Sequence, residues 1–303
     1  MKITLIGTSP AMLMEAILLR NEFKNAQIEI HEKDKLPGGS WKTTNILKKN
    51  FIETGSHIFA PWKKKKLYNS CINILKSRFN LKIYMLKPKP LNIINHNISK
   101  DELDKINYYY IKGGAGTLLN YLLNYIKKKN IKIFFNSNIK NINLSKHNKK
   151  KITCNKKKFL TDQVYIPHYC CINLDFFKKN QDFSKKKSTH VIFKFSSQYN
   201  FKKKISYIQK VNFSNFFDRM SNLSIMMNSK DYYFCLRICE NFKFKFYKNQ
   251  KIVIKKIKED LLTFLQPSIK NKKRLQFYYK VFRYETNYRN INQLKKIIYP
   301  KGV

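Results

Sequence analysis

The first 33 residues follow a pattern that few folds accommodate. Residues 3, 5 and 6 are apolar and residues 7–10 are turn formers. Residues 11–23 have apolar side chains at helical spacing, and residues 27–32 have the pattern of a second strand. This order predicts a βαβ unit with two parallel strands in one sheet. Glu32 ends the second strand, 25 residues after the glycine of the turn. An acidic residue at this place is typical of a dinucleotide site, where it accepts hydrogen bonds from the adenosine ribose.

The glycine fingerprint of such a site, Gly-x-Gly-x-x-Gly, is incomplete. Gly7 stands at its first position, but Ser9 and Met12 stand at the second and third. Ser9 adds a side chain where a pyrophosphate would approach the backbone, and Met12 adds bulk where helix and strand pack. The start of the helix still favours an anion through its N–H groups and its dipole. Two interpretations stay open at this point: a dinucleotide site, and an ordinary βαβ unit that binds nothing.

The other glycines are few and clustered. Average usage would give roughly 21 glycines in a chain of this length. This chain has eight, and seven of them lie in the first 116 residues. A sequence that has lost most glycines keeps them where a positive φ or a close backbone approach excludes a Cβ. The informative positions are therefore Gly7, Gly38, Gly39, Gly55, Gly113, Gly114 and Gly116.

Three segments that contain these glycines resemble one family. Residues 32–41 (Glu-Lys-Asp-Lys-Leu-Pro-Gly-Gly-Ser-Trp) join an acidic residue to a Gly-Gly pair. Residues 52–59 (Ile-Glu-Thr-Gly-Ser-His-Ile-Phe) hold an acidic-x-Gly-x-His stretch, and residues 110–118 (Tyr-Ile-Lys-Gly-Gly-Ala-Gly-Thr-Leu) hold Gly-Gly-x-Gly-x-Leu. In this order they resemble the FAD-dependent amine oxidase superfamily, which includes phytoene desaturases, protoporphyrinogen oxidases and amine oxidases. The His-Ile-Phe of the second segment is also similar to the UDP-galactopyranose mutases.

Two more segments extend the resemblance to about two-fifths of the chain, residues 1–60 and 107–167. Residues 131–139 are similar to the strand and loop whose aliphatic residue contacts adenine through its backbone, and residues 158–166 to the strand that returns to the nucleotide domain. The family closes its FAD site with a C-terminal Gly-Asp motif, which this sequence lacks. We therefore expect a divergent member that is either truncated or holds flavin in another way.

The resemblance implies an α/β fold, with a Rossmann-type FAD/NAD(P)-binding domain and an inserted α+β substrate domain. It places the FAD-binding domain at residues 1–60 and 107–169, and the substrate or cap domain at residues 61–106 and 170–303. His57 could equally be bonded to the backbone of its loop, and Trp41 could simply pack on the sheet. The residues that the resemblance implies for FAD are Gly7, Ser9, Glu32, Gly38, Gly39, Trp41, His57, Gly113, Gly114, Gly116 and Ile139.

Outside these segments the pattern predicts further elements. Residues 63–78 are expected to be a basic helix, and residues 252–265 a second helix that Pro267 terminates. Runs rich in Tyr, Phe and Ile predict strands, at residues 190–195, 232–238 and 242–247.

The extreme charge, +44 at pH 7, on its face indicates nucleic acid or an anionic membrane surface. However, only seven of the 62 basic residues are Arg. Lys, Asn and Ile have A/T-rich codons, so drift toward an AT-rich genome would produce this composition without selection for charge. Selected nucleic-acid surfaces favour Arg for bidentate contacts. We therefore expect no specific nucleic-acid partner, and interpret the lysine runs as solvated loops.

Six cysteines show no Cys-x-x-Cys pair and no zinc-like spacing with His, so we expect reduced thiols, no metal and a cytoplasmic protein. His168, Cys170 and Cys171 lack further ligands nearby, and Cys235 and Cys239 are expected to be structural. No stretch reaches 18 uncharged apolar residues, and residues 1–19 suit the fold better than a signal peptide.

Two hypotheses about function follow. The first is an FAD-dependent oxidoreductase of the amine oxidase type, which transfers hydride from a small organic substrate to flavin. The alternative is a non-catalytic or vestigial descendant of the same fold that no longer binds flavin. A basic nucleic-acid-binding protein is a third and weaker hypothesis. The sequence identifies neither the substrate, nor catalytic residues, nor the oligomeric state.

Overall fold

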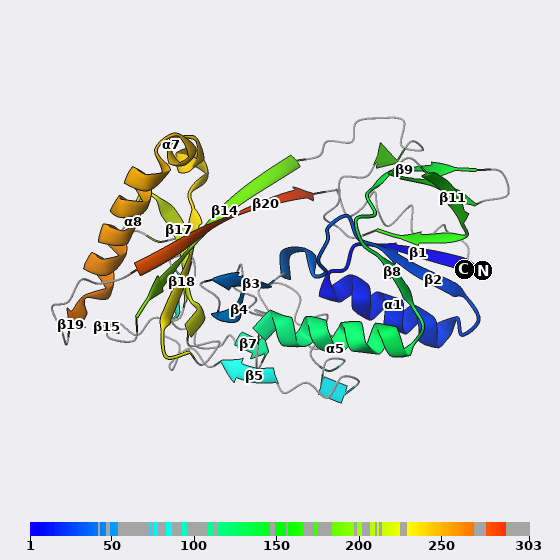
Figure 1. Cartoon of the computed structure of the whole chain (residues 1–303), viewed down its shortest axis with the longest axis horizontal. Coiled ribbons are helices and arrows are strands. Elements are labelled where there is room, and N and C mark those ends of the chain that lie inside the picture. Colours follow the sequence, from blue (N-terminus) through cyan, green and yellow to red (C-terminus); the bar gives the residue numbers. More distant parts are fainter. Residues whose placement is uncertain are drawn as a thin grey trace. The chain divides into compact units, whose positions relative to one another are not determined.

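The computed structural model describes residues 1–41, 43–46, 49–53, 73, 76–77, 83–86, 93–95, 108–111, 114–145, 149–155, 157–166, 173–174, 184–196, 199–201, 207–209, 211, 214–224, 229–269 and 277–288. The chain divides into two compact units (Figure 1). The first comprises Met1–Lys42, Leu118–Lys187 and Glu285–Val303, and the second Thr43–Thr117 and Ser188–Tyr284. Most of the helix predicted over residues 63–78 lies outside the described residues.

The first unit contains a four-stranded parallel sheet in the order β12-β1-β2-β8. Its strands are β1 (Lys2–Ile6), β2 (Gln27–His31), β8 (Lys132–Phe134) and β12 (Gln163–Tyr165). Ile3 of β1 is paired with Ile28 of β2, and both side chains are buried. The predicted adjacency of the two N-terminal strands is therefore confirmed, as is the return of the chain to this sheet after residue 158.

Helix α1 (Pro10–Glu22) connects β1 to β2, in contact with both strands. Pro10 suits the first helical position because its missing N–H would have no partner there. Ser9 is the N-cap residue. Leu13, Ala16 and Ile17 are buried at helical spacing, so this face stabilises the helix through packing.

The first unit also contains a small mixed sheet, in which β9, β10 and β11 are antiparallel and β13 pairs parallel with β9. Its strands, in the order β11-β10-β9-β13, are β9 (Ile139–Leu144), β10 (Lys150–Cys154), β11 (Lys157–Thr161) and β13 (Asn173–Leu174). Helix α5 (Gly114–Lys128) leads through a short turn into β8. Ile6 of the parallel sheet shares one apolar cluster with Ile139, Ile142, Ile152 and Ile166. This cluster binds the two sheets together.

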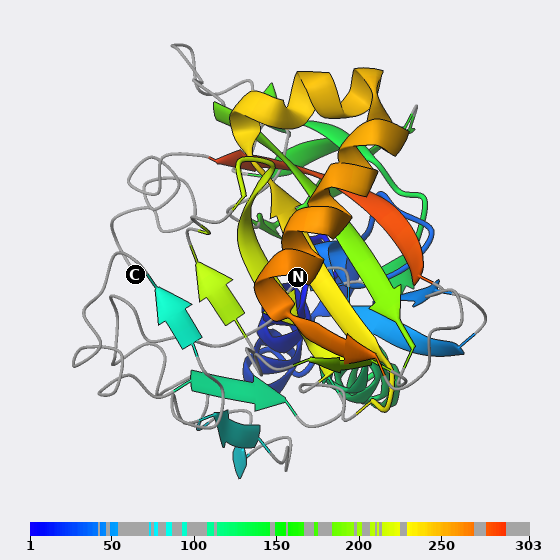
Figure 2. The same cartoon turned by 90° about the vertical axis from the view of Figure 1, so that its left-hand side faces the viewer.

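The second unit is built on a six-stranded sheet in the order β20-β14-β18-β17-β16-β6. Its strands are β6 (Ile93–Asn95), β14 (Ser184–Phe195), β16 (Tyr207–Gln209), β17 (Phe217–Asn222), β18 (Tyr232–Ile238) and β20 (Phe277–Tyr288). Figure 2 shows α8 (Gln250–Leu265) across one face of this sheet. Ile257 and Leu261 of α8 and Phe193 of β14 are wholly buried in one core. The strands predicted at 190–195 and 232–238 and the helix at 252–265 are confirmed.

The strand predicted at residues 242–247 is wrong. These residues form the end of a 3-10 turn (Glu240–Phe242) and then α7 (Lys243–Lys248). Alternating Phe and Lys has the period of a strand, but Phe242 and Phe246 also lie four residues apart, on one face of a helix. Both pack against the core of the second unit, and Phe246 is wholly buried. Tertiary packing therefore decides between two periods that the sequence allows.

Six short strands complete the described elements as two-stranded sheets. They are β3 (Thr43–Ile46) with β4 (Lys49–Glu53), β5 (Ile83–Leu86) with β7 (Tyr108–Ile111), and β15 (Tyr199–Phe201) with β19 (Pro267–Ile269). Among the described residues, no helix is long and apolar enough to cross a membrane.

Candidate nucleotide-binding site

The candidate site begins at the turn between β1 and α1. Gly7 adopts φ 86°, in the left-handed region, and its N–H donates to the carbonyl of His31 at 2.8 Å. A residue with a Cβ would be strained there, which explains why this glycine is retained. The turn is thereby fixed to the carboxyl end of β2.

Ser9 and Met12 occupy the two positions where the fingerprint has lost glycine. The hydroxyl of Ser9 accepts a hydrogen bond from the N–H of Met12 at 3.4 Å, and its carbonyl accepts one from Leu13 at 3.0 Å. Ser9 thus caps the helix whose start a pyrophosphate would approach. Met12 is 7% exposed and is part of the core. Both substitutions therefore stabilise the unit itself.

Glu32 follows β2 and is almost buried, with 4% of its surface exposed. One carboxylate oxygen, Oε2, accepts the N–H of Thr8 at 2.9 Å and the hydroxyl of Thr8 at 2.5 Å. The other, Oε1, accepts the N–H of Asp34 at 3.0 Å. The carboxylate of Glu32 is therefore hydrogen-bonded to the glycine turn and to its own loop.

Thr8 is the residue that sequence reasoning missed. It is wholly buried, and its hydroxyl accepts the N–H of Gly38 at 3.0 Å while it donates to Glu32. The only signal in the sequence is a hydroxyl-bearing residue inside the fingerprint, directly after Gly7. A long-range contact to residue 38 has no signature in a single sequence.

The Gly-Gly pair lies against the same turn. Gly38 and Gly39 adopt φ 110° and 56°, so both need the left-handed region that glycine tolerates. A Cβ on Gly39 would lie 3.9 Å from the Cβ of Ser9. Trp41 ends the 3-10 turn η1 (Gly39–Trp41), and its N–H donates to the carbonyl of Gly38 at 2.8 Å. The structure thus brings the Gly7 turn together with residues 32–41.

The other predicted residues belong to separate elements or lie outside the described residues. Gly114, with φ 79°, and Gly116 are at the start of α5 and belong to the second unit. Ile139 begins β9, where its side chain is buried in the core between the two sheets of the first unit. His57 and Gly113 lie outside the described residues. A role of any of these in cofactor binding stays a prediction.

The groups around the turn suit the adenosine and pyrophosphate part of FAD. The carboxylate of Glu32 offers acceptor oxygens of the kind that ribose hydroxyls need, and a Cβ on Gly39 would lie at ordinary contact distance from Ser9. Pro10 has no N–H, and Leu13 already donates to Ser9. The start of α1 can therefore offer an anion the N–H of Ala11, which is an exposed residue, and that of Met12 if the anion displaces the hydroxyl of Ser9.

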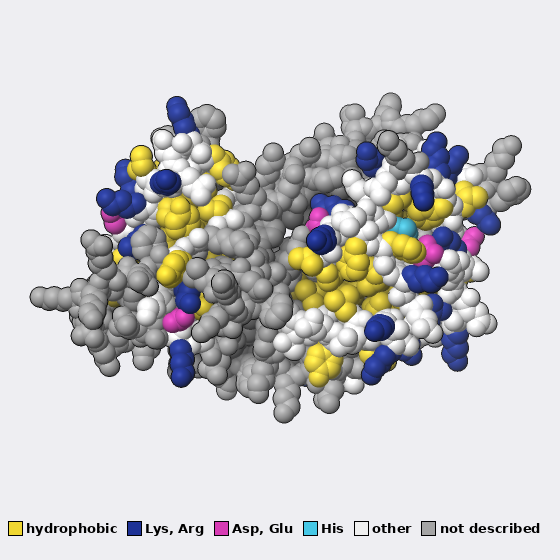
Figure 3. Space-filling model, in the orientation of Figure 1, with side chains coloured by type: hydrophobic (Ala, Val, Ile, Leu, Met, Phe, Trp, Pro, Cys, Tyr) yellow, Lys and Arg dark blue, Asp and Glu magenta, His cyan; other side chains and the backbone are white. Residues whose placement is uncertain are grey.

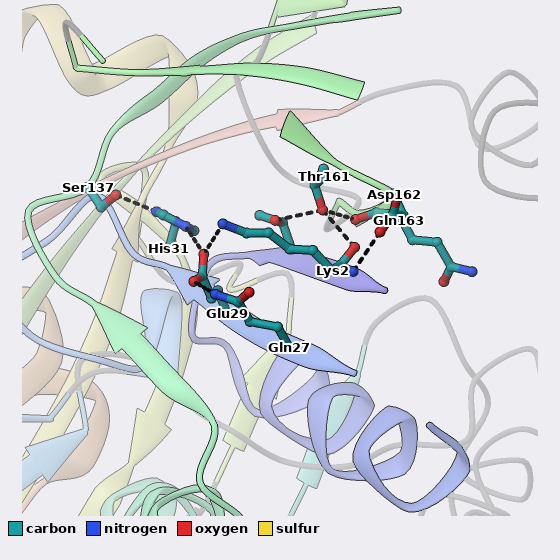
Figure 4. Close-up of polar contacts among 9 residues, drawn as sticks. Lys2, Gln27, Glu29, His31, Ser137, Thr161, Asp162 and Gln163 are labelled. Carbon is teal, nitrogen blue, oxygen red and sulfur yellow. Dashed lines mark hydrogen bonds and ion pairs between the residues drawn. The ribbon is translucent and has the colours of Figure 1, made fainter. Parts of the chain in front are cut away.

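A second polar cluster consists of side chains from β1 and β2 together with Ser137 (Figure 4). Glu29 lies 2.9 Å from the ammonium of Lys2 and 3.7 Å from Nε2 of His31, whose Nδ1 is 2.6 Å from the hydroxyl of Ser137. Ser137 is in turn 2.9 Å from Sγ of Cys154. Phe134 and Phe159 stack on the His31 ring at centroid distances of 5.0 and 5.1 Å.

Burial controls the charges in this cluster. Burial lowers the pKa of His31 because it disfavours the imidazolium, and the neighbouring Lys2 lowers it further, against the opposing effect of Glu29. Burial alone would raise the pKa of Glu29, but the hydrogen bond and charge of Lys2 outweigh it, so this pKa is lowered. The order Ser137, His31, Glu29 resembles a hydrolytic triad. All three are buried, with 7% of Ser137 exposed, so the cluster is closed to substrate and acts in packing.

Figure 3 shows Lys and Arg side chains dispersed over the visible face of the described residues, between apolar and neutral ones. The described residues contain no group of three or more His, Cys, Asp or Glu that could hold a metal ion.

The chain has a mixed helix-and-strand fold with parallel and antiparallel sheets, and solved structures share it. One, from Exiguobacterium sp. 255-15, is named as a candidate protoporphyrinogen oxidase; it has a TM-score of 0.64 at 8% identity and covers 99% of this chain and 92% of its own. An oxidoreductase from Methanosarcina mazei has a TM-score of 0.62 at 10% identity, covering 93% of this chain and 88% of its own. A protein from Pyrococcus furiosus has a TM-score of 0.60 at 11% identity with the same coverage. No family model and no curated protein matches the sequence.

Proposed function

We propose that this protein is an FAD-dependent oxidoreductase of the amine oxidase type. The observation that supports it most is the position of Glu32, which is held against the Gly7 turn and the Gly38 turn at the carboxyl end of β2. This is where a dinucleotide-binding βαβ unit needs its acidic residue. The names of two structures with the same fold, an oxidoreductase and a candidate protoporphyrinogen oxidase, agree with the proposal.

In this proposal each group around the turn has one task. Glu32 accepts a hydrogen bond from the adenosine ribose, and the N–H groups at the start of α1 bind the pyrophosphate. Gly38 and Gly39 let the backbone approach the cofactor, and Trp41 lies beside them. The flavin would supply the chemistry by accepting hydride from a small organic substrate. Residues 61–106 and 170–303 would contribute the substrate domain.

One observation favours a second candidate, a descendant of this fold that no longer binds flavin. The hydroxyl of Ser9 accepts a hydrogen bond from the N–H of Met12, and the hydroxyl of Thr8 donates one to the carboxylate of Glu32. Two groups that a dinucleotide would contact are thus already bonded within the chain. In this case the retained glycines serve only the turns.

Flavin binding separates the two candidates. The purified full chain is expected to be yellow, or to quench flavin fluorescence on titration with FAD. Glu32→Ala removes a hydrogen bond to a charged acceptor worth ~1.5–3 kcal/mol, which is a loss of FAD affinity of roughly 10- to 150-fold. Gly39→Val should weaken binding at least as much, because it places a branched side chain in left-handed backbone.

Circular dichroism checks that both variants fold. A folded wild type that is colourless and binds no FAD up to ~100 μM, so that its binding free energy is weaker than about 5.5 kcal/mol, would refute the oxidoreductase proposal and favour the second candidate.

A further inference from the structure

We infer that Thr8 restricts Glu32 to a single hydrogen bond from the cofactor, so the protein recognises one of the two adenosine ribose hydroxyls and ignores the other. The inference rests on the proposed function and assigns to Thr8, as a positioning residue, the selectivity of that same site.

The restriction follows from a count of acceptor positions. An ionised carboxylate has about four lone-pair sites, two on each oxygen. Both sites of Oε2 are used by the N–H and the hydroxyl of Thr8, at 2.9 and 2.5 Å. The N–H of Asp34 uses one site of Oε1, at 3.0 Å. One site on Oε1 remains, whereas a ribose presents two adjacent hydroxyl donors.

The hydrogen bond from the hydroxyl of Thr8 to the carboxylate of Glu32 is costly to break. Its hydroxyl also accepts the N–H of Gly38 at 3.0 Å, so rotation of the side chain would break two hydrogen bonds at once. Gly38 is buried and Thr8 is wholly buried, so water does not replace the lost partners. A β-branched side chain also has few alternative χ1 rotamers. The hydroxyl of Thr8 is therefore a fixed competitor for Oε2.

The experiment uses ADP, 2′-deoxy-ADP and 3′-deoxy-ADP as probes, with isothermal titration calorimetry on the full chain. For the wild type, one deoxy analogue should bind ~10-fold or more weakly than ADP, because it lacks the hydroxyl that donates to Oε1. The other should bind within about threefold of ADP. The ratio of the two deoxy affinities is the readout, since a general loss of stability would lower both alike.

Three variants test the role of Thr8. Thr8→Ser keeps the hydroxyl and should keep the ratio. Thr8→Val keeps the shape but frees one site on Oε2, so the second hydroxyl gains an acceptor and the ratio should fall below about threefold. Thr4→Val is the matched control, because Thr4 is also wholly buried on β1 and its hydroxyl donates to Thr161 at 3.0 Å, outside the site. It should keep the wild-type ratio.

Equal losses for both analogues in the wild type would overturn the inference and leave the proposed function standing, because Glu32 would then accept both hydroxyls or neither. A ratio that persists in folded Thr8→Val would also overturn it. If Thr8→Val fails to fold, the wild-type ratio and Thr8→Ala decide in its place. No binding of either ADP or FAD by the wild type would refute the proposed function itself.

Discussion

Lys2 should stabilise the fold more at pH 8 than at pH 5.5. Its ammonium neutralises Glu29 at 2.9 Å, and the side chains of Lys2 and Glu29 are 26% and 8% exposed. The pair lies between a surface ion pair, worth about 0–1 kcal/mol, and a buried pair, whose disruption costs about 3–5 kcal/mol. We expect Lys2→Met to lower the free energy of unfolding by ~2 kcal/mol at pH 8.

Acidification should reduce this cost because His31 can replace the lost ammonium. In the wild type the pKa of His31 is below its ordinary value of 6.5, through burial and the repulsion of Lys2. Its contribution to stability is therefore complete above pH 6.5 and is lost as the pH falls, because only the unfolded chain binds the proton readily. Without Lys2, the imidazolium faces only Glu29, at 3.7 Å. The pKa of His31 in the variant should rise, so the variant should lose less stability than the wild type as the pH falls.

Urea unfolding of wild type and Lys2→Met at pH 8 and pH 5.5 measures the difference. Glu29 in the wild type has a lowered pKa, so it stays ionised at both pH values and contributes stability that is lost only below about pH 4.5. Without Lys2, burial would raise the pKa of Glu29, and its protonation would also reduce the cost of the variant at pH 5.5. Lys132→Met is the matched control, because Lys132 is an exposed lysine on β8 of the same sheet. It should change stability by less than ~0.5 kcal/mol at both pH values. A cost of Lys2→Met that is equal at both pH values would refute the reasoning.

Further predictions concern the core, the cap and the charge. Ile257→Ala should destabilise the protein by ~2–5 kcal/mol, because Ile257 is wholly buried between α8 and the six-stranded sheet; thermal unfolding measures it, and the exposed neighbour Ile252→Ala should cost much less. Ser9→Gly should cost only a few tenths of a kcal/mol in unfolding experiments, because glycine is a tolerated N-cap, and should tighten FAD binding if the proposed function holds. Binding to duplex DNA should be weak, independent of sequence and steeply reduced by salt in a fluorescence anisotropy titration. Sub-micromolar affinity for one sequence at about 0.2 M salt would show that the charge is selected.

The sequence was sufficient for the βαβ unit because local signals agree there. The strand patterns of β1 and β2, the turn at Gly7 and the helical spacing of α1 all indicate the same element order. The Gly-Gly pair was also identifiable, because in a chain so poor in glycine a retained pair marks left-handed backbone. The φ angles of Gly38 and Gly39 are indeed positive, in the region that favours glycine.

The sequence was insufficient wherever a long-range contact decides the outcome. Nothing local reveals that Phe246 packs into a distant core, so the alternation of Phe and Lys predicted a strand where α7 lies. The same holds for Thr8, whose role depends on contacts with Glu32 and Gly38, 24 and 30 residues away. It also holds for the cluster around His31, because Ser137 is 106 residues away along the chain.

The loss of two fingerprint glycines weakens the site less than the sequence implies. The bond between the Ser9 hydroxyl and the N–H of Met12 is 3.4 Å long, beyond the 2.7–3.2 Å range of a well-formed N–H···O bond. A pyrophosphate oxygen would form a charge-assisted bond to the same N–H, which is roughly twice as strong as a neutral one. The anion should therefore displace the hydroxyl of Ser9. Loss of this N-cap hydrogen bond costs about 1 kcal/mol or less of stability. The side chain of Met12 does not reduce the affinity for an anion, because it is buried in the core and only the backbone N–H of Met12 would contact the anion. On these magnitudes, we expect the incomplete fingerprint to lower the affinity for a dinucleotide without abolishing it, which supports the proposed flavin-binding function over the alternative that binds no flavin.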